Sequence, residues 1–287
     1  MFPPPFGYAA PRTLEEALAL LAERGPAARP LAGGQSLIPQ LKLRTLRPSL
    51  LVDLRHLPLA GIEEEDGHLV LGATVTHAAL EASEAIRERH PLLHDVASVV
   101  GDPLVRNLGT VGGSAAQADP RGDWGAALLA AGAVLVAAGP EGEREIGAED
   151  FFTGSYDTAL RADELLVRIR LPRRPRGGGS YHKLRRRVGD FATVGVAVDL
   201  SLDRDGAIED CGIGLTGVGL TYVRAGKAAE HLRGRRPDPR ALRRAAELAA
   251  EECHPIGDER GSAAYKRELV RVFALRGLER ALARAAG

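Results

Sequence analysis

The spacing of hydrophobic residues near the N-terminus predicts an amphipathic helix. Apolar side chains recur on one helical face, and they are Leu14, Ala17, Leu18 and Leu21. Thr13 and Glu16 have the spacing of a capping box at the start of this helix, and Gly25 stands where a C-terminal cap is expected. The pattern therefore gives the helix a defined beginning and end.

The pattern then changes to short apolar runs. A strand at 29–32, a glycine turn, a helix that begins after Ser36 and a strand at 50–53 predict a small parallel βαβ part. From residue 61 the runs are strand-like on both sides of Asp66-Gly67, which is a strong hairpin signal. A second, antiparallel sheet is expected to start there.

Further elements extend this antiparallel part. Helices are expected at 76–80, 92–100 and 123–130, and the runs "AVLVAA" and "ELLVRIRLP" read as strands of the same sheet. The stretch "PRRPRGGG" is rich in proline, glycine and charge, so we place the main domain boundary there. The residues beyond this boundary are expected to form a three-stranded antiparallel meander and then amphipathic helices.

The predicted fold class is thus α+β, and two domains are expected. The first covers residues 1–176 and consists of a parallel part at 1–57 and an antiparallel part at 58–176. The second covers residues 177–287. A chain of 287 residues is long enough to bury a core in each.

Composition narrows the function classes. The 38 Lys and Arg residues balance 38 Asp and Glu residues, which disfavours broad binding to nucleic acid or anionic membranes. No run approaches the roughly eighteen apolar residues of a membrane span, and the N-terminus lacks the features of a signal peptide, so a cytoplasmic protein is expected. Cys211 and Cys253 are too few for an iron–sulfur cluster or a four-cysteine zinc site. Any redox chemistry would therefore use an organic cofactor.

Two pairs of adjacent glycines, at 33–34 and 112–113, are the main candidates for a binding site. Each pair is followed by a serine, Ser36 or Ser114, and each is expected near the start of a helix. Taken singly, such a pair is more often a packing turn. Taken together, they suggest two cradles of backbone N–H groups for a pyrophosphate, which a Cβ atom would block. Neither pair has the spacing of a P-loop or of a dinucleotide-binding Rossmann unit.

The stretches "LAGGQSLIPQLKLRTLRPSLLVDLRHL" and "VRNLGTVGGSAAQADPRGDW" strongly resemble the FAD-binding medium subunit of molybdenum hydroxylases, the xanthine dehydrogenase and aerobic carbon monoxide dehydrogenase group. The resemblance continues through "DELLVRIRLP" and "YHKLRRRVGDFATVGVAV" and covers essentially the whole chain. It implies an FAD-binding fold of the vanillyl-alcohol-oxidase type, followed by the C-terminal domain of the molybdenum hydroxylase flavoproteins.

The same resemblance implies the cofactor contacts. The residues expected to hold the pyrophosphate and its surroundings are Ala32, Gly33, Gly34, Gln35, Ser36, Leu37, Thr110, Val111, Gly112, Gly113 and Ser114. Asp123 falls where the family places a carboxylate on the nucleotide portion of FAD, although it also suits a helix N-cap. Leu166 and Lys183 fall near the isoalloxazine contacts, and a surface lysine is the alternative for Lys183. Phe191 would cover a flavin face or belong to the core.

The positions of the histidines bear on two expectations, the attachment of FAD and the presence of a metal site. Gln35 stands where many relatives carry histidine, and no histidine lies in either glycine motif, so the FAD is expected to be non-covalent. His90 and His94 have a spacing that suits two metal ligands on one helix face. Because His90 precedes Pro91, it is expected outside the helix, and no metal site is predicted.

The resemblance implies an electron-transfer subunit of a larger oxidoreductase, with no catalytic acid or base of its own. Partner subunits would carry the molybdenum cofactor and two [2Fe–2S] clusters, in a dimer of heterotrimers, and the FAD would reduce NAD or a quinone-type acceptor. Two alternatives remain open at this point. The chain could be a stand-alone FAD-dependent oxidoreductase of the same fold, or a non-catalytic nucleotide-binding assembly protein.

Overall fold

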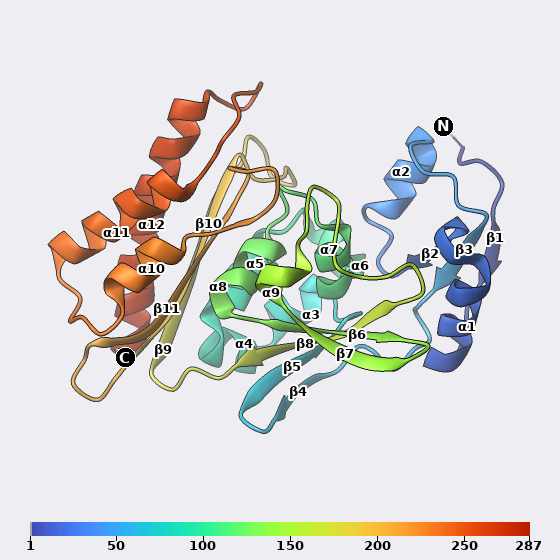
Figure 1. Cartoon of the computed structure of the whole chain (residues 1–287), viewed down its shortest axis with the longest axis horizontal. Coiled ribbons are helices and arrows are strands. Elements are labelled where there is room, and N and C mark those ends of the chain that lie inside the picture. The colour runs from blue at the N-terminus through green and yellow to red at the C-terminus, as the bar shows by residue number, and fades with distance from the viewer. Residues whose placement is uncertain (1) are drawn as a thin grey trace.

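A computed structural model describes residues 2–287 and contains three sheets (Figure 1). The N-terminal sheet is parallel and has the order β1-β3-β2. Its elements are β1 (Gly7–Ala9), α1 (Leu14–Arg24), the 3-10 turn η1 (Gly25–Ala27), β2 (Ala28–Leu31), α2 (Leu37–Leu43) and β3 (Leu50–Asp53). The parallel part is confirmed, and β1 is an addition to it, since its three residues are too short for a period-two pattern.

The boundaries of α1 follow the predicted signals with one difference. The Thr13 hydroxyl accepts a hydrogen bond from the Glu16 N–H at 3.2 Å, and Gly25 ends the helix with a φ of 52°. The Glu16 carboxylate accepts from the N–H of Arg12 rather than from that of Thr13. One of the two hydrogen bonds of the capping box is thus present, and the other comes from the residue before the N-cap.

The second sheet is antiparallel, with the order β4-β5-β8-β6-β7. Its strands are β4 (Ile62–Glu65), β5 (His68–Gly72), β6 (Val134–Gly139), β7 (Gly142–Gly147) and β8 (Leu165–Pro172). Asp66 and Gly67 have φ angles of 48° and 75° and join β4 to β5, as the hairpin signal predicts. The second sheet is therefore confirmed.

Within residues 77–151, seven helices lie along the chain before and after the strands of this sheet, and some of them fill the space between it and the sheet of residues 177–224. They are α3 (His77–Ala82), α4 (Glu84–Arg89), α5 (Pro91–Val99), α6 (Pro103–Leu108), α7 (Val111–Gln117), α8 (Trp124–Ala131) and α9 (Ala148–Phe151). The three helices expected from sequence are α3, α5 and α8. The other four have at most seven residues, which is too short for a clear helical period.

The C-terminal sheet has four strands rather than the three predicted, in the order β12-β11-β10-β9. They are β9 (Gly177–Leu184), β10 (Val194–Leu202), β11 (Ile208–Thr216) and β12 (Val223–Arg224). β12 was missed because it has only two residues and is defined by its pairing with Gly214 and Leu215. The helices after it are α10 (Gly226–Leu232), α11 (Pro239–Glu252) and α12 (Ala263–Ala285).

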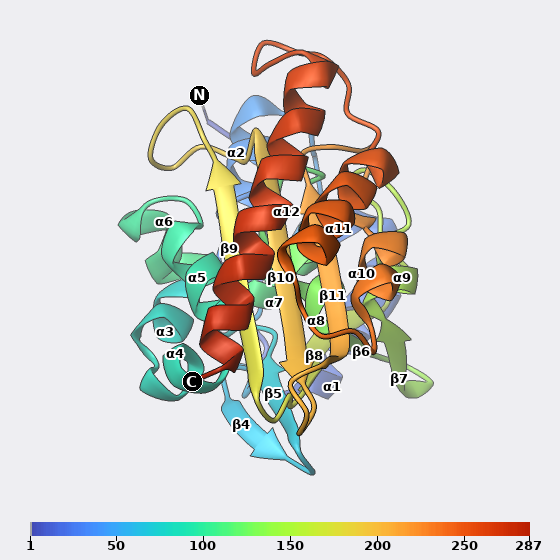
Figure 2. The same cartoon turned by 90° about the vertical axis from the view of Figure 1, so that its left-hand side faces the viewer.

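Helices cover both faces of this last sheet. α11 and α12 lie on one face (Figure 2), and α5 and α8 pack on the other (Figure 1). Every residue of α8 is buried, which explains its continuous apolar run. A Cβ atom on Gly212 or Gly214 of β11 would lie 1.9 Å from a carbonyl oxygen of α8, so these glycines allow the helix to approach the strand.

The hydrophobic core beside α8 draws on both sides of the predicted domain boundary. It contains Trp124 and Leu128 of α8 together with Tyr181 of β9 and Ala197 of β10. The division into residues 1–176 and 177–287 stays a prediction. No helix within residues 2–287 has the length and apolar character needed to cross a membrane.

Candidate cofactor-binding site

A cavity of about 810 Å³ lies between the parallel sheet, the antiparallel sheet and the end of β9. The predicted site residues that line it are Ala32, Gly33, Gly34, Gln35, Ser36, Leu37, Thr110, Gly112, Gly113, Ser114, Asp123, Leu166 and Lys183. Val111 is the exception, because its side chain is fully buried in the core. Residues far apart in the sequence are thus brought to one cavity.

The first glycine motif is the loop between β2 and α2. Gly34 has a φ of 72°, and the Gln35 side chain donates to the Gly33 carbonyl at 3.2 Å, so the turn is partly held by its own residues. The backbone N–H groups of residues 33–37 donate no hydrogen bond to any part of residues 2–287. The Ser36 side chain, expected to cap α2, makes no cap hydrogen bond. This loop presents unused donors suited to an anion.

The glycines of the second motif lie in the first turn of α7, near the start of a helix as predicted. The N–H groups of Val111 and Gly112 donate to carbonyls of Val75 and Ala73, and that of Gly113 donates to the Thr110 hydroxyl at 3.1 Å. The N–H groups of residues 111–114 are therefore already used, by tertiary contacts and by the start of the helix, and the prediction that they are free is wrong. The N–H group of Thr110 donates no hydrogen bond within residues 2–287.

The glycines themselves allow the two motifs to touch. A Cβ atom on Gly33 would lie 2.0 Å from the Leu108 carbonyl oxygen and 2.7 Å from the Cα atom of Gly109. A Cβ atom on Gly113 would lie 2.7 Å from the Thr110 hydroxyl and 3.5 Å from the Cβ atom of Ala32. The sequence predicts that a Cβ atom at these positions would block the phosphate. In the structure it would instead meet other atoms of the protein, so the glycines allow two segments to approach closely.

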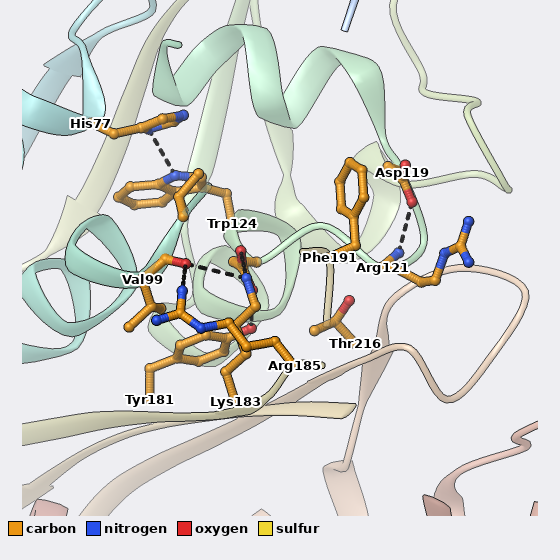
Figure 3. A network of polar contacts seen from close by, with 12 residues as sticks. His77, Val99, Asp119, Arg121, Trp124, Tyr181, Lys183, Arg185, Phe191 and Thr216 are labelled. Atoms are coloured by element: carbon orange, nitrogen blue, oxygen red, sulfur yellow. Dashed lines mark hydrogen bonds and ion pairs between the residues drawn. The ribbon is translucent and has the colours of Figure 1, made fainter. Parts of the chain in front are cut away.

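A buried carboxylate, an ammonium group and a phenol meet at one wall of the cavity. Figure 3 shows the phenol of Tyr181 and the side chain of Lys183 close together. The Asp123 carboxylate lies 2.8 Å from the Lys183 ammonium and accepts a hydrogen bond of 2.7 Å from the Tyr181 hydroxyl. Lys183 and Arg185 both donate to the Val99 carbonyl. The Asp123 and Lys183 side chains are only 4% and 3% exposed, so water screens this ion pair very little.

These contacts decide between the alternatives for the two side chains. Lys183 is not a surface lysine, and Asp123 precedes α8 without making an N-cap hydrogen bond through its side chain. Burial raises the pKa of Asp123, while the Lys183 ammonium and the Tyr181 hydrogen bond oppose that rise. Asp123 and Lys183 thus form one buried ion pair in the wall of the cavity.

Two apolar side chains complete the predicted set. Leu166 lies on β8 beside an irregularity in its pairing with β6 and is buried. Phe191 lies in the loop after β9, lines the cavity and is 45% exposed, so it is not a core residue. Its carbonyl accepts a hydrogen bond from Arg260, which connects this loop to the segment before α12.

Comparison with known families agrees with this arrangement. Residues 4–174 match the family described as "FAD binding domain in molybdopterin dehydrogenase", and residues 179–281 match the "CO dehydrogenase flavoprotein C-terminal domain". The chain belongs to the FAD-binding medium subunits of the molybdenum hydroxylases. The resemblance inferred from the sequence is therefore confirmed, and with it the fold class and the FAD-binding character of the first part.

Individual relatives align with this chain over almost its full length. The carbon monoxide dehydrogenase medium chain of Afipia carboxidovorans is 42% identical, over 99% of each chain. A structure of carbon monoxide dehydrogenase from Hydrogenophaga pseudoflava, lacking the Mo-pyranopterin moiety of the molybdenum cofactor, superposes with a TM-score of 0.95 at 40% identity and 99% coverage of each chain. Quinoline 2-oxidoreductase from Pseudomonas putida 86 gives a TM-score of 0.92 at 36% identity, over 100% of each chain.

Sequence reasoning missed a further wall of the site, the loop of residues 152–164 before β8. Arg144 of β7 donates to both carboxylate oxygens of Glu164 at 2.7 and 2.8 Å, and to the Ala159 carbonyl at 2.6 Å. The Arg144 hydrogen bonds hold the pKa of Glu164 below its usual range. No short-range motif marks this pair, because the strand pairing alone brings Arg144 close to the end of the loop.

Replacing Arg144 by methionine should loosen this wall. Glu164, whose side chain is 5% exposed, would lose its counter-charge, and we expect the free energy of unfolding to fall by about 1–3 kcal/mol. Denaturant unfolding measures this, and limited proteolysis should show faster cleavage within 152–164. Arg168→Met is the matched control, because both partners of the Arg168–Glu143 pair are 43% exposed and about 0–1 kcal/mol is expected. Equal losses in both variants would contradict the assignment.

His90 and His94 lie at the start of α5. His90 precedes α5 as its N-cap residue, outside the helix as expected. Across residues 2–287, no group of three His, Cys, Asp or Glu side chains is placed to hold a metal ion. Cys211 and Cys253 are buried free thiols.

Proposed function

We propose that this chain is the FAD-carrying electron-transfer subunit of a molybdenum hydroxylase complex. It would take electrons from [2Fe–2S] clusters of a partner and pass them to NAD or a quinone-type acceptor. The observation that carries the proposal is the set of unused N–H donors of residues 33–37, all of which line a cavity of about 810 Å³. Such donors suit the pyrophosphate of a dinucleotide.

Each group at the site has a role in this proposal. The loop 33–37 and the Ser114 hydroxyl would hold the pyrophosphate, and the Asp123–Lys183 pair would contact one portion of the cofactor. Leu166 and Phe191 would pack against the isoalloxazine. FAD, bound non-covalently, would supply the redox chemistry. Asp123 and Lys183 neutralise each other, which suits a subunit that holds a cofactor and transfers no substrate protons.

The partners follow from the family. Several relatives are named as medium chains or medium subunits of dehydrogenases and hydroxylases. We propose that this chain assembles with a large subunit that carries the molybdenum cofactor and a small subunit that carries two [2Fe–2S] clusters, as a dimer of heterotrimers. We also propose that its two domains divide near residue 176, between β8 and β9.

Co-expression with the genomic neighbours of this chain tests the proposal. The chain, carrying an affinity tag, is expected to co-purify with molybdenum and iron–sulfur subunits and with one FAD per copy, measured by metal analysis and flavin absorption. A chain that purifies alone and oxidises a small substrate would favour a stand-alone oxidoreductase. A colourless protein that is indifferent to added FAD would exclude both of these functions.

A further inference from the structure

His77, at the start of α3, lies in the wall of the cavity but belongs to neither glycine motif. The residue is only 3% exposed, and its backbone N–H donates to the Gly109 carbonyl at 3.0 Å. Its ring lies against the same residue, since a Cβ atom on Gly109 would be 3.0 Å from His77 Nε2. The ring is therefore fixed in place by the backbone that precedes the second motif.

Trp124 determines which ring nitrogen carries the proton. The indole N–H of Trp124 donates to Nδ1 of His77 at 3.1 Å (Figure 3). Because an indole nitrogen only donates, Nδ1 must be the unprotonated nitrogen and Nε2 must carry the hydrogen. Burial, with a smaller contribution from the Arg106 charge, lowers the pKa of His77 to about 4. At neutral pH the side chain is thus an uncharged Nε2–H donor.

This donor has no acceptor within residues 2–287, and it is not sealed in the core either. No hydrogen bond from Nε2 is formed, and Nε2 is not among the fully buried polar atoms that lack a partner. Since His77 lines the cavity, the N–H group opens on it. A buried side chain held in one tautomer with its donor turned to a cavity is typical of a ligand contact.

The position of Gly109 indicates which part of the ligand is near. Gly109 precedes Thr110 of the second motif, and a Cβ atom on Gly33 of the first motif would lie 2.7 Å from its Cα atom. His77, Gly33 and Thr110 therefore meet around one residue, at the junction of the two motifs. The anionic group expected at this junction is the pyrophosphate.

We propose that His77 is a binding residue for the FAD pyrophosphate, donating through Nε2–H as a neutral imidazole. Trp124 is its positioning residue, because the indole fixes the tautomer and orientation of the ring. The inference rests on FAD binding in this cavity. It adds a side-chain donor where residues 111–114 of the second motif have already used their N–H groups.

The test compares FAD with riboflavin, which has no phosphate, on the protein purified with its partners and stripped of flavin. For His77→Phe, we expect the Kd of FAD to rise about ten- to hundredfold, as for a lost hydrogen bond to a charged group, and the Kd of riboflavin to stay unchanged. His77→Gln keeps an acceptor for the indole and a donor for the phosphate, so it should largely restore FAD affinity. The exposed His56, replaced by phenylalanine, is the matched control.

Several results would overturn the inference. An unchanged FAD affinity in a folded His77→Phe protein would refute the contact between His77 and FAD but leave the proposed function intact. Equal losses of affinity for FAD and riboflavin would show that His77 contacts a part of FAD other than the pyrophosphate. A wild-type complex that binds no FAD would overturn the proposed function as well. Should His77→Phe fail to fold, long-range ¹H–¹⁵N spectra of the wild-type protein decide the matter: the Nε2–H tautomer must be present, and its signal must shift when FAD is added but not when riboflavin is added.

Discussion

Replacing Gly33 by valine should abolish retention of FAD and also lower the stability of the protein. The Cβ atom would lie 2.0 Å from the Leu108 carbonyl oxygen, which is backbone and cannot turn aside. The first motif would have to move away from the second, and its N–H groups would no longer converge on one anion. We expect a loss of FAD affinity of at least about hundredfold, as for two hydrogen bonds to a charged group. Flavin content and binding titrations measure it.

The loss of stability distinguishes a clash between the two motifs from direct blocking of the phosphate by the valine side chain. Overpacking of this kind costs about 1–3 kcal/mol of unfolding free energy, even in protein stripped of flavin. Gly226→Ala is the control, since a Cβ atom there meets nothing within 4 Å. If Gly33→Val loses FAD with full stability, the position faces the phosphate after all. If it retains FAD, the assignment of the first motif is wrong.

Replacing Lys183 by methionine should destabilise the folded protein strongly. Asp123 would remain buried without its counter-charge, with only the Tyr181 hydroxyl as a close hydrogen-bond donor. Breaking a buried pair in this way costs about 3–5 kcal/mol. Chemical denaturation of flavin-free protein at neutral pH measures the loss. The double variant Lys183→Met with Asp123→Asn removes both charges and should recover a large part of it.

The loss in Lys183→Met should depend on pH with a defined sign. The pKa of Asp123 is already raised above 3.8 by burial, and removal of the ammonium raises it further. Between 3.8 and that raised pKa the folded state binds more protons than the unfolded state, so stability falls as the pH rises through this window. The variant should therefore approach the wild type at acid pH. A loss that does not vary with pH would show that Asp123 is not the group concerned.

Most of the fold was accessible from local patterns. The Asp66-Gly67 hairpin and the Thr13 cap use short-range chemistry, and both are found where predicted. β12 was missed for a different reason. It has only two residues, which is too short to show a period, and it is defined by its pairing with β11.

The sequence predicted which residues belong to the site but not which of them pair with one another. Nearly all of the expected residues line one cavity, because the motifs that identify the family are those that build its walls. The pairing of Asp123 with Lys183, and of Arg144 with Glu164, had no signal in the sequence. These partners lie on separate elements, and only the packing of sheets and helices brings them together.

The sequence alone determined the order of elements, the absence of a strong net charge and the two glycine motifs, since each depends on residues close together in the chain. The tertiary structure decided which of these groups are free to bind. It used the N–H groups of residues 111–114 internally and left those of residues 33–37 open. It also fixed the tautomer of His77 through Trp124, 47 residues away. Hydrogen-bond partners and burial are properties of the folded chain, and they distinguish a binding group from a structural one.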